Sequence, residues 1–97
     1  DDGHIASLFP GDPALNRGVD PATEAPCILT QAAAPPHERL SLTLATLLSS
    51  RWIALLINGS AKWAALETAL EQQDPQASPV YALLNQRQVA VNVFYAP

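Results

Sequence analysis

The amino-acid sequence predicts an α/β fold with a parallel sheet and flanking helices. Apolar segments with the length of strands alternate along the chain with segments of helical periodicity, and strands joined by helices form right-handed βαβ units. One segment, 52–57, is apolar at six consecutive positions, which is typical of a parallel strand buried on both faces. The 97 residues are enough for no more than one domain.

Composition and charge limit the kinds of partner that we expect. Only 14% of the residues are charged and 48% are hydrophobic, whereas about 25% charged residues are usual in soluble domains, so we expect part of the surface to lie against further polypeptide. The net charge of −4 argues against binding to nucleic acid or to an anionic membrane surface, and no apolar run approaches the roughly 18 residues of a membrane span. The single cysteine, Cys27, excludes an internal disulfide and favours a reducing compartment such as the cytoplasm.

The beginning of the sequence contains the strongest candidate for chemistry. Gly3 permits a tight turn that other residues resist, and Asp2 and His4 flank it, so that both side chains can be presented at the tip of a loop. A histidine there can accept or donate a proton near neutral pH, although a plain surface loop is the alternative. We expect a short helix at 5–9, ended by the Pro-Gly pair at 10–11.

A short strand lies between two irregular segments. Prolines and glycines predict a loop at 11–26, and the alanines and prolines at 31–36 predict a second, extended connection. The apolar residues 27–30 between them predict a buried strand. We expect Cys27 in the core, because free cysteines are among the most buried residues.

Leucine spacing predicts a helix at 40–48. The leucines recur at the intervals that place side chains on one helical face, at Leu40, Leu44, Leu47 and Leu48. Arg39 would then lie at or just before the first helical turn, where a cation opposes the helix dipole unless an anion neutralises it. Arg39 is therefore either an anion ligand or a solvated side chain.

The strand at 52–57 leads into a second candidate anion site. Ser60 is a suitable N-cap for a helix at 61–71, and Lys62 lies in its first turn, where unpaired N–H groups and the helix dipole attract anions. Lys62 is therefore a candidate phosphate ligand, with an ordinary surface lysine as the alternative. The side chains that we expect to be buried in this region are Trp52, Trp63, Leu66 and Leu70.

A short helix at 80–86 and a β-branched strand at 89–94 are the last predicted elements. In parallel sheets, ligands bind beyond the carboxyl ends of the strands. Arg39 and Lys62 both follow predicted strands, and the loop of His4 would do so too if a strand precedes it. We therefore expect these three parts of the chain to meet at one edge of the sheet.

Three segments resemble sequence signatures of the 6-phosphogluconolactonases. Residues 2–11 read Asp-Gly-His-Ile-Ala-Ser-Leu-Phe-Pro-Gly, residues 35–44 read Pro-Pro-His-Glu-Arg-Leu-Ser-Leu-Thr-Leu, and residues 58–62 read Asn-Gly-Ser-Ala-Lys. The family belongs to a wider group that includes glucosamine-6-phosphate deaminase. The resemblance implies a Rossmann-like α/β domain of which residues 1–97 would form the C-terminal half. The N-terminal half of the same chain, or a second copy, would be the partner that completes it.

The resemblance also implies an enzyme, a hydrolase that opens 6-phospho-D-glucono-1,5-lactone to 6-phosphogluconate in the pentose phosphate pathway. His4 would be the general base for water and then the general acid for the leaving ring oxygen, and Asp2 would orient its ring. Gly3, Arg39 and Lys62 would bind the substrate, the two cations through its phosphate. No metal or cofactor is implied, because a lactone is already an activated ester.

Two other functions stay open on the sequence alone. A deaminase or isomerase of amino-sugar phosphates on the same fold would need a catalytic glutamate where this sequence has Phe9. A non-catalytic sugar-phosphate-binding module would use Arg39 and Lys62 and would have no need of His4. The sequence also departs from the lactonases at Ala34, where many members have a lysine that could contact an anion.

Overall fold

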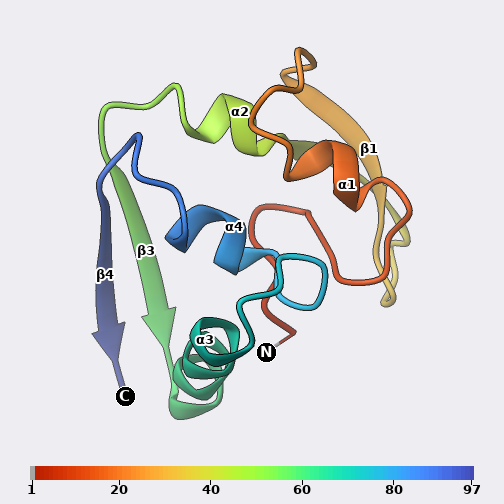
Figure 1. Cartoon of the computed structure of the whole chain (residues 1–97). Coiled ribbons are helices and arrows are strands. Elements are labelled where there is room, and N and C mark those ends of the chain that lie inside the picture. The colour runs from red at the N-terminus through yellow and green to blue at the C-terminus, as the bar shows by residue number, and fades with distance from the viewer. Residues whose placement is uncertain (1) are drawn as a thin grey trace.

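The strands of the protein are divided between two small sheets. The computed structural model describes residues 2–97. Its helices and strands, in chain order, are α1 (Leu15–Gly18), β1 (Cys27–Gln31), β2 (Glu38–Leu42), α2 (Leu44–Leu47), β3 (Ile53–Asn58), α3 (Ser60–Gln72), α4 (Val80–Leu84) and β4 (Val91–Ala96). β1 pairs with β2 as an antiparallel hairpin, and β3 pairs with β4 in parallel (Figure 1). The predicted α/β class with a parallel sheet is confirmed, although the parallel part consists of β3 and β4 alone among the described residues.

The parallel pair agrees with the prediction from the sequence. Its register runs from Ile53 opposite Val91 to Asn58 opposite Ala96. α3 and α4 connect the two strands, and α3 packs against β3. Strand β4 begins two residues later than predicted, whereas β3 and α3 match their predicted segments closely.

Within residues 2–97, β3 is covered on one face only. Its side chains alternate between the faces, so that Ile57 is buried whereas Leu56 is 76% exposed. The prediction of a strand buried on both faces is therefore wrong for the described part of the chain, because the helices pack on a single side. Trp52 and Leu70, expected to be buried, are also exposed, and Trp63 is half-buried against the ring of Tyr95.

The segment predicted as a buried strand at 27–30 forms the first strand of the hairpin. Ile28 and Thr30 face inward and are buried, whereas Cys27 and Leu29 face outward and are exposed. The expectation of Cys27 in the core is therefore wrong. Because a hairpin packs by one face, every second residue of its strands points away from the protein.

The predicted helix at 40–48 is wrong over its first half. Residues 38–42 form β2, and only Leu44–Leu47 are helical. The leucine spacing misleads here because Leu40 and Leu42 also fit the two-residue period of a strand, with the buried Ser41 between them. The side chain of Thr43 accepts a hydrogen bond from the backbone N–H of Thr46 and so begins α2.

Two local details also differ from the prediction. Residues 5–9 form a tight turn rather than a helix, closed by a 2.8 Å hydrogen bond from the N–H of Leu8 to the carbonyl of Ile5. At α3, the cap position is Gly59, with φ of +95°, and Ser60 is the first helical residue; no side chain of residues 2–97 caps the helix. No helix among the described residues is long and apolar enough to cross a membrane.

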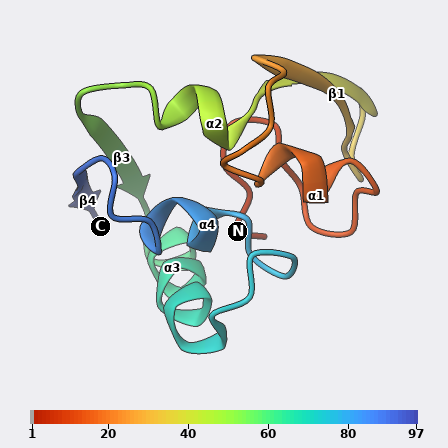
Figure 2. The same cartoon turned by 45° about the horizontal axis from the view of Figure 1, so that its top comes forward.

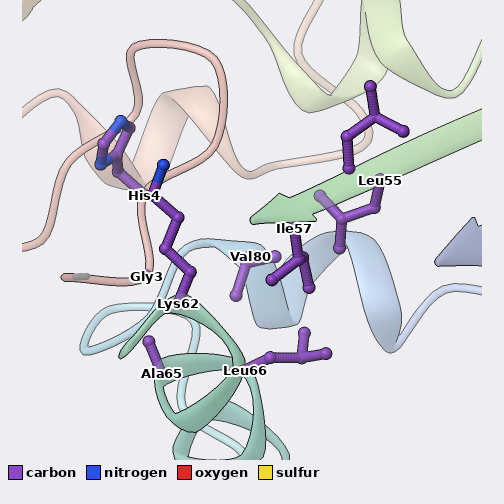
Figure 3. Close-up of a pocket in the computed structure, with 9 residues that line it drawn as sticks. Gly3, His4, Leu55, Ile57, Lys62, Ala65, Leu66 and Val80 are labelled. Carbon is purple, nitrogen blue, oxygen red and sulfur yellow. The ribbon is translucent and has the colours of Figure 1, made fainter. Parts of the chain in front are cut away.

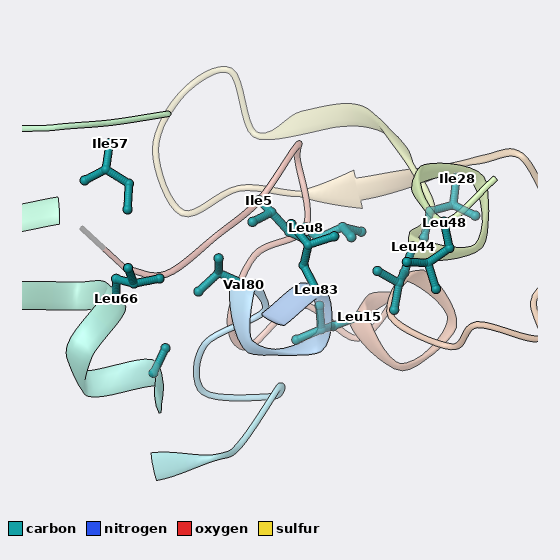
Figure 4. Close-up of a cluster of buried hydrophobic side chains, with 11 residues drawn as sticks. Ile5, Leu8, Leu15, Ile28, Leu44, Leu48, Ile57, Leu66, Val80 and Leu83 are labelled. Atoms are coloured by element: carbon teal, nitrogen blue, oxygen red, sulfur yellow. The ribbon is translucent and has the colours of Figure 1, made fainter. Parts of the chain in front are cut away.

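One hydrophobic cluster joins the two sheets, and the N-terminal segment lies inside it. Figures 1 and 2 place the hairpin at one end of the molecule and the β3–β4 pair at the other, with the N-terminal segment and α4 between them. Leu8 is fully buried, and a Cβ on Gly18 would lie only 2.4 Å from its Cδ2. Burial of one leucine side chain contributes about 1.5–3 kcal/mol, so this segment is firmly anchored. The cluster comprises Ile5, Leu8, Leu15, Ile28, Leu44, Leu48, Ile57, Leu66, Ala69, Val80 and Leu83 (Figure 4).

Candidate active site

Asp2 and His4 form a contact within a single tight turn. The Oδ1 atom of Asp2 accepts a hydrogen bond from the backbone N–H of His4 at 3.0 Å and lies 2.6 Å from His4 Nδ1. Both side chains are about half exposed, so the contact adds little to the free energy of unfolding. Its consequence is orientation, because one carboxylate oxygen holds both the backbone and the ring of His4.

The charge of Asp2 determines which nitrogen of His4 is free. Partial burial raises the pKa of Asp2, but the hydrogen bonds and the charge of His4 outweigh that effect, and the pKa lies below its ordinary value of 3.8. Asp2 is therefore ionised at neutral pH, and an ionised carboxylate only accepts hydrogen bonds. Nδ1 of His4 must then bear the proton, which leaves Nε2 able to accept one. No hydrogen bond within residues 2–97 engages Nε2.

Gly3 fixes the position of this turn on the protein. Its φ of +80° is unfavourable for other residues, and a Cβ there would lie 3.0 Å from Cβ and Oγ of Ser78. The carbonyl of Gly3 accepts a 2.8 Å hydrogen bond from the N–H of Val80. The loop that presents His4 is therefore attached to the beginning of α4 by contacts that only glycine permits.

His4 and Lys62 line the same cleft. The cleft has a volume of about 200 Å³ and lies where β3 ends and α3 begins. Lys62 extends from the first turn of α3 toward the loop of His4 (Figure 3). The polar wall of the cleft consists of Gly3, His4 and Lys62. Its apolar wall consists of Leu55, Leu56, Ile57, Ala65, Leu66 and Val80.

The surroundings of Lys62 suit an anion. The side chain is exposed, and none of residues 2–97 forms an ion pair with it. It stands at the N-terminus of a 13-residue helix, where unpaired N–H groups and the helix dipole both favour negative charge. An anion bound there would neutralise the lysine and the helix end together.

Arg39 lies on a strand and not at the start of a helix, contrary to the prediction. In the hairpin it is opposite Thr30 and half-buried, and it does not line the cleft. Its guanidinium carbon is 5.6 Å from the centre of the Phe9 ring, and that ring is 4.8 Å from the ring of His4. Arg39 therefore comes close to His4 through an aromatic side chain.

The hairpin holds the loop of His4 through Ser41, a residue that the sequence analysis did not single out. Ser41 is buried, and its Oγ accepts a 3.0 Å hydrogen bond from the N–H of Ser7 and donates one to the carbonyl of Leu42. The buried carboxylate of Asp12 acts similarly and accepts hydrogen bonds from the N–H groups of Ala14 and Gln31. A serine between two leucines in a strand would have been the signal for an inward polar contact.

The chemistry available to this site is proton transfer beside a bound anion. His4 supplies a nitrogen able to accept a proton, and Lys62 supplies a positive charge at the other side of the cleft. Nowhere in residues 2–97 do three or more histidine, cysteine, aspartate or glutamate side chains gather in a way that could hold a metal ion. His4 and Lys62 together fit acid–base catalysis on a small anionic molecule.

Known proteins with similar sequences share one description. The chain matches the family of glucosamine-6-phosphate isomerases/6-phosphogluconolactonase over residues 1–92. The 6-phosphogluconolactonase of Pseudomonas putida is 39% identical over 97 residues, which include 100% of this chain and 39% of that protein. The 6-phosphogluconolactonase of Caulobacter vibrioides is 44% identical over 97 residues, which include 98% of this chain and 40% of that protein.

A solved structure gives the same result for the fold. The crystal structure of a 6-phosphogluconolactonase from Shewanella baltica matches with a TM-score of 0.89 at 37% identity, over 97% of this chain and 40% of that one. The chain thus spans about 40% of the length of the relatives that it matches. Sequence and structure agree that the chain belongs to the glucosamine-6-phosphate isomerase/6-phosphogluconolactonase family.

Proposed function

We propose that the intact protein hydrolyses 6-phospho-D-glucono-1,5-lactone to 6-phosphogluconate, a step of the pentose phosphate pathway. The observation that supports this most is the Asp2–His4 pair. Asp2 holds Nδ1 of His4 and leaves Nε2 free, and His4 lines the same cleft as Lys62. The similar proteins named 6-phosphogluconolactonase support the same reaction. These proteins are much longer than 97 residues. In the proposed enzyme, residues 1–97 therefore form the C-terminal part of one domain. An exposed free thiol at Cys27 fits the reducing cytoplasm.

The proposed reaction needs one proton-transfer group and no cofactor. Nε2 of His4 takes a proton from water as the water oxygen bonds to the C1 carbonyl carbon. The resulting tetrahedral intermediate collapses when the bond from C1 to the ring oxygen breaks, and His4 returns the proton to that oxygen. The products are a carboxyl group and a hydroxyl group. Asp2 stabilises the imidazolium that exists between these two transfers.

Lys62 and Arg39 would bind the 6-phosphate, and Gly3 would allow the substrate to approach the backbone closely. Charge-assisted hydrogen bonds to phosphate are strong. We expect Lys62→Ala and Arg39→Ala each to weaken substrate binding by roughly 1.5–3 kcal/mol, or about 10- to 150-fold in kcat/KM. For the unphosphorylated lactone the loss should vanish. Coupled assays on both lactones, corrected for spontaneous hydrolysis, measure this.

Arg51→Ala is the matched control for this pair. Arg51 is exposed and precedes the amino end of β3, at the opposite end of the strand from Lys62. We expect it to leave kcat/KM for both lactones unchanged. Equal losses on the phosphorylated and unphosphorylated lactones in the Lys62 and Arg39 variants would mean that these residues support the fold instead.

Asp2→Asn separates the charge of Asp2 from its role in the turn. An asparagine oxygen can still accept from the backbone N–H of His4, but it does not stabilise an imidazolium. We expect kcat to fall by about 10²-fold with KM little changed. The pKa of Asp2 in the folded protein is lowered from 3.8. The stabilisation that the ionised Asp2 gives to His4 in the wild type is therefore fully present above pH 3.8. It is lost as the pH falls through the lowered pKa and the carboxylate becomes protonated. An unchanged kcat at neutral pH in Asp2→Asn would contradict the assignment.

A further inference from the structure

Phe9 is a buried hydrophobic residue that lies outside the cluster joining the two sheets. Its side chain is 9% exposed, yet among residues 2–97 the cluster that joins the two sheets does not include it. The aromatic and cationic groups on its ring are His4, with ring centres 4.8 Å apart, and Arg39, with its guanidinium carbon 5.6 Å from the ring centre. These distances are typical of aromatic pairs and of cation–π contacts. A large apolar side chain is thus placed between two polar residues of the candidate site.

The contact with Phe9 restrains the ring of His4, because the hydrogen bond with Asp2 fixes the position of one ring atom only. Asp2 holds Nδ1, but the second side-chain torsion of histidine is broad, so the ring plane is not determined by that bond. A ring packed at 4.8 Å with an interplanar angle of 33° restricts the rotation. Proton transfer depends steeply on the position of the accepting atom, and a displacement of about 1 Å can cost about 10²-fold in rate.

The contact with Phe9 also restrains Arg39. Its Nε donates a 2.6 Å hydrogen bond to the carbonyl of Pro36, which leaves the two terminal nitrogens of the guanidinium for a ligand. The guanidinium carbon lies over the Phe9 ring, 5.6 Å from its centre, so the ring supports the guanidinium. The backbone of Phe9 is itself anchored, because Leu8 before it is fully buried and the N–H of Asp12 donates to the Phe9 carbonyl.

We infer that Phe9 is a positioning residue, which sets the ring plane of His4 and the place of the Arg39 guanidinium relative to one another. The inference rests on the proposed lactonase reaction, in which His4 acts at C1 while Arg39 binds the phosphate of the same molecule. One rigid ring in contact with both groups keeps their separation matched to the substrate. In this role Phe9 acts through His4 and Arg39 and takes no part in the reaction itself.

The test replaces Phe9 by leucine and by tyrosine in the intact protein. Leucine keeps an apolar side chain and removes the ring, so we expect kcat to fall by about 10- to 100-fold and KM to rise by about two- to fivefold. Tyrosine keeps the ring, so we expect kcat to return to within about threefold of the wild type. In proton–nitrogen NMR spectra, the His4 ring signal should shift in Phe9→Leu, because it loses the ring current of Phe9, and should return in Phe9→Tyr.

Phe94→Leu is the matched control, since Phe94 is the other phenylalanine of this chain and its ring lies tilted against Trp52 instead, with ring centres 6.2 Å apart. We expect it to leave kcat, KM and the His4 signal unchanged. If Phe9→Leu leaves them unchanged while His4→Ala abolishes activity, Phe9 has no positioning role and the proposed function stands. If His4→Ala retains full activity, the proposed function itself fails. Near-ultraviolet circular dichroism checks folding, and should Phe9→Leu not fold, Phe9→Met measured against Phe9→Tyr decides in the same way.

Discussion

Replacement of His4 by alanine should lower kcat for the phosphorylated lactone by about 10²- to 10⁴-fold. The loss should appear in kcat with little change in KM, because in the proposed reaction Nε2 acts on the attacking water and on the leaving oxygen and does not bind the phosphate. The measurement is a coupled lactonase assay on the intact protein. Spontaneous hydrolysis of the lactone must be subtracted, since it becomes a large part of the observed rate in a slow variant.

His37→Ala is the control for this prediction. His37 is the other histidine of the chain, is exposed, and contacts the carbonyl of Ala32 in the connection between β1 and β2. Its loss should leave kcat close to the wild-type value, since nothing places it in the cleft. A kcat that stays unchanged in His4→Ala, or falls equally in His37→Ala, would remove His4 from its proposed role.

The 97-residue chain alone should have no lactonase activity and should not remain a monomer. A sheet of two strands is only marginally stable by itself; α3 packs on one face of β3, and Leu56 on the other face is 76% exposed. The hairpin adds a second uncovered apolar face, where Leu29 and Leu40 lie opposite one another and are both about 70% exposed. Apolar faces and unpaired strand edges of this kind associate with other polypeptide.

We propose that the polypeptide covering these faces is the N-terminal part of a longer lactonase, with a second copy of the chain as the alternative. Size-exclusion chromatography with light scattering gives the mass of the isolated chain in solution. A coupled assay with and without an added N-terminal portion then gives the activity, which should be regained only in the mixture. A stable and fully active 97-residue monomer would contradict the proposal.

The elements that the sequence predicted well are those with a single local explanation. Six consecutive apolar residues followed by Asn-Gly and a helical segment fit only a strand that leads into a helix, and β3 and α3 form there. The turn of Asp2, Gly3 and His4 was expected for the same reason, because only glycine suits its backbone. The position of Lys62 in the first turn of α3 follows from the predicted start of that helix. In the structure Lys62 lines the same cleft as His4.

The hairpin was missed because its leucines satisfy two periods at once. Leu40 and Leu44 are four residues apart, as on one face of a helix, whereas Leu40 and Leu42 are two apart, as on one face of a strand. Pairing with β1 decides between the two, and pairing is a long-range interaction that no local pattern contains. The approach of Arg39 to Phe9 depends on that pairing, so it could not be predicted either.

The central claim is that this cleft serves hydrolysis of a phosphorylated sugar lactone. The most direct measurement is kcat/KM of the intact wild-type protein for 6-phospho-D-glucono-1,5-lactone and for the unphosphorylated lactone, with ammonia release from glucosamine 6-phosphate followed in parallel. We predict a rate well above spontaneous hydrolysis, a strong preference for the phosphorylated lactone, and no ammonia. Ammonia release, or a lactone rate no higher than the spontaneous one, would contradict it.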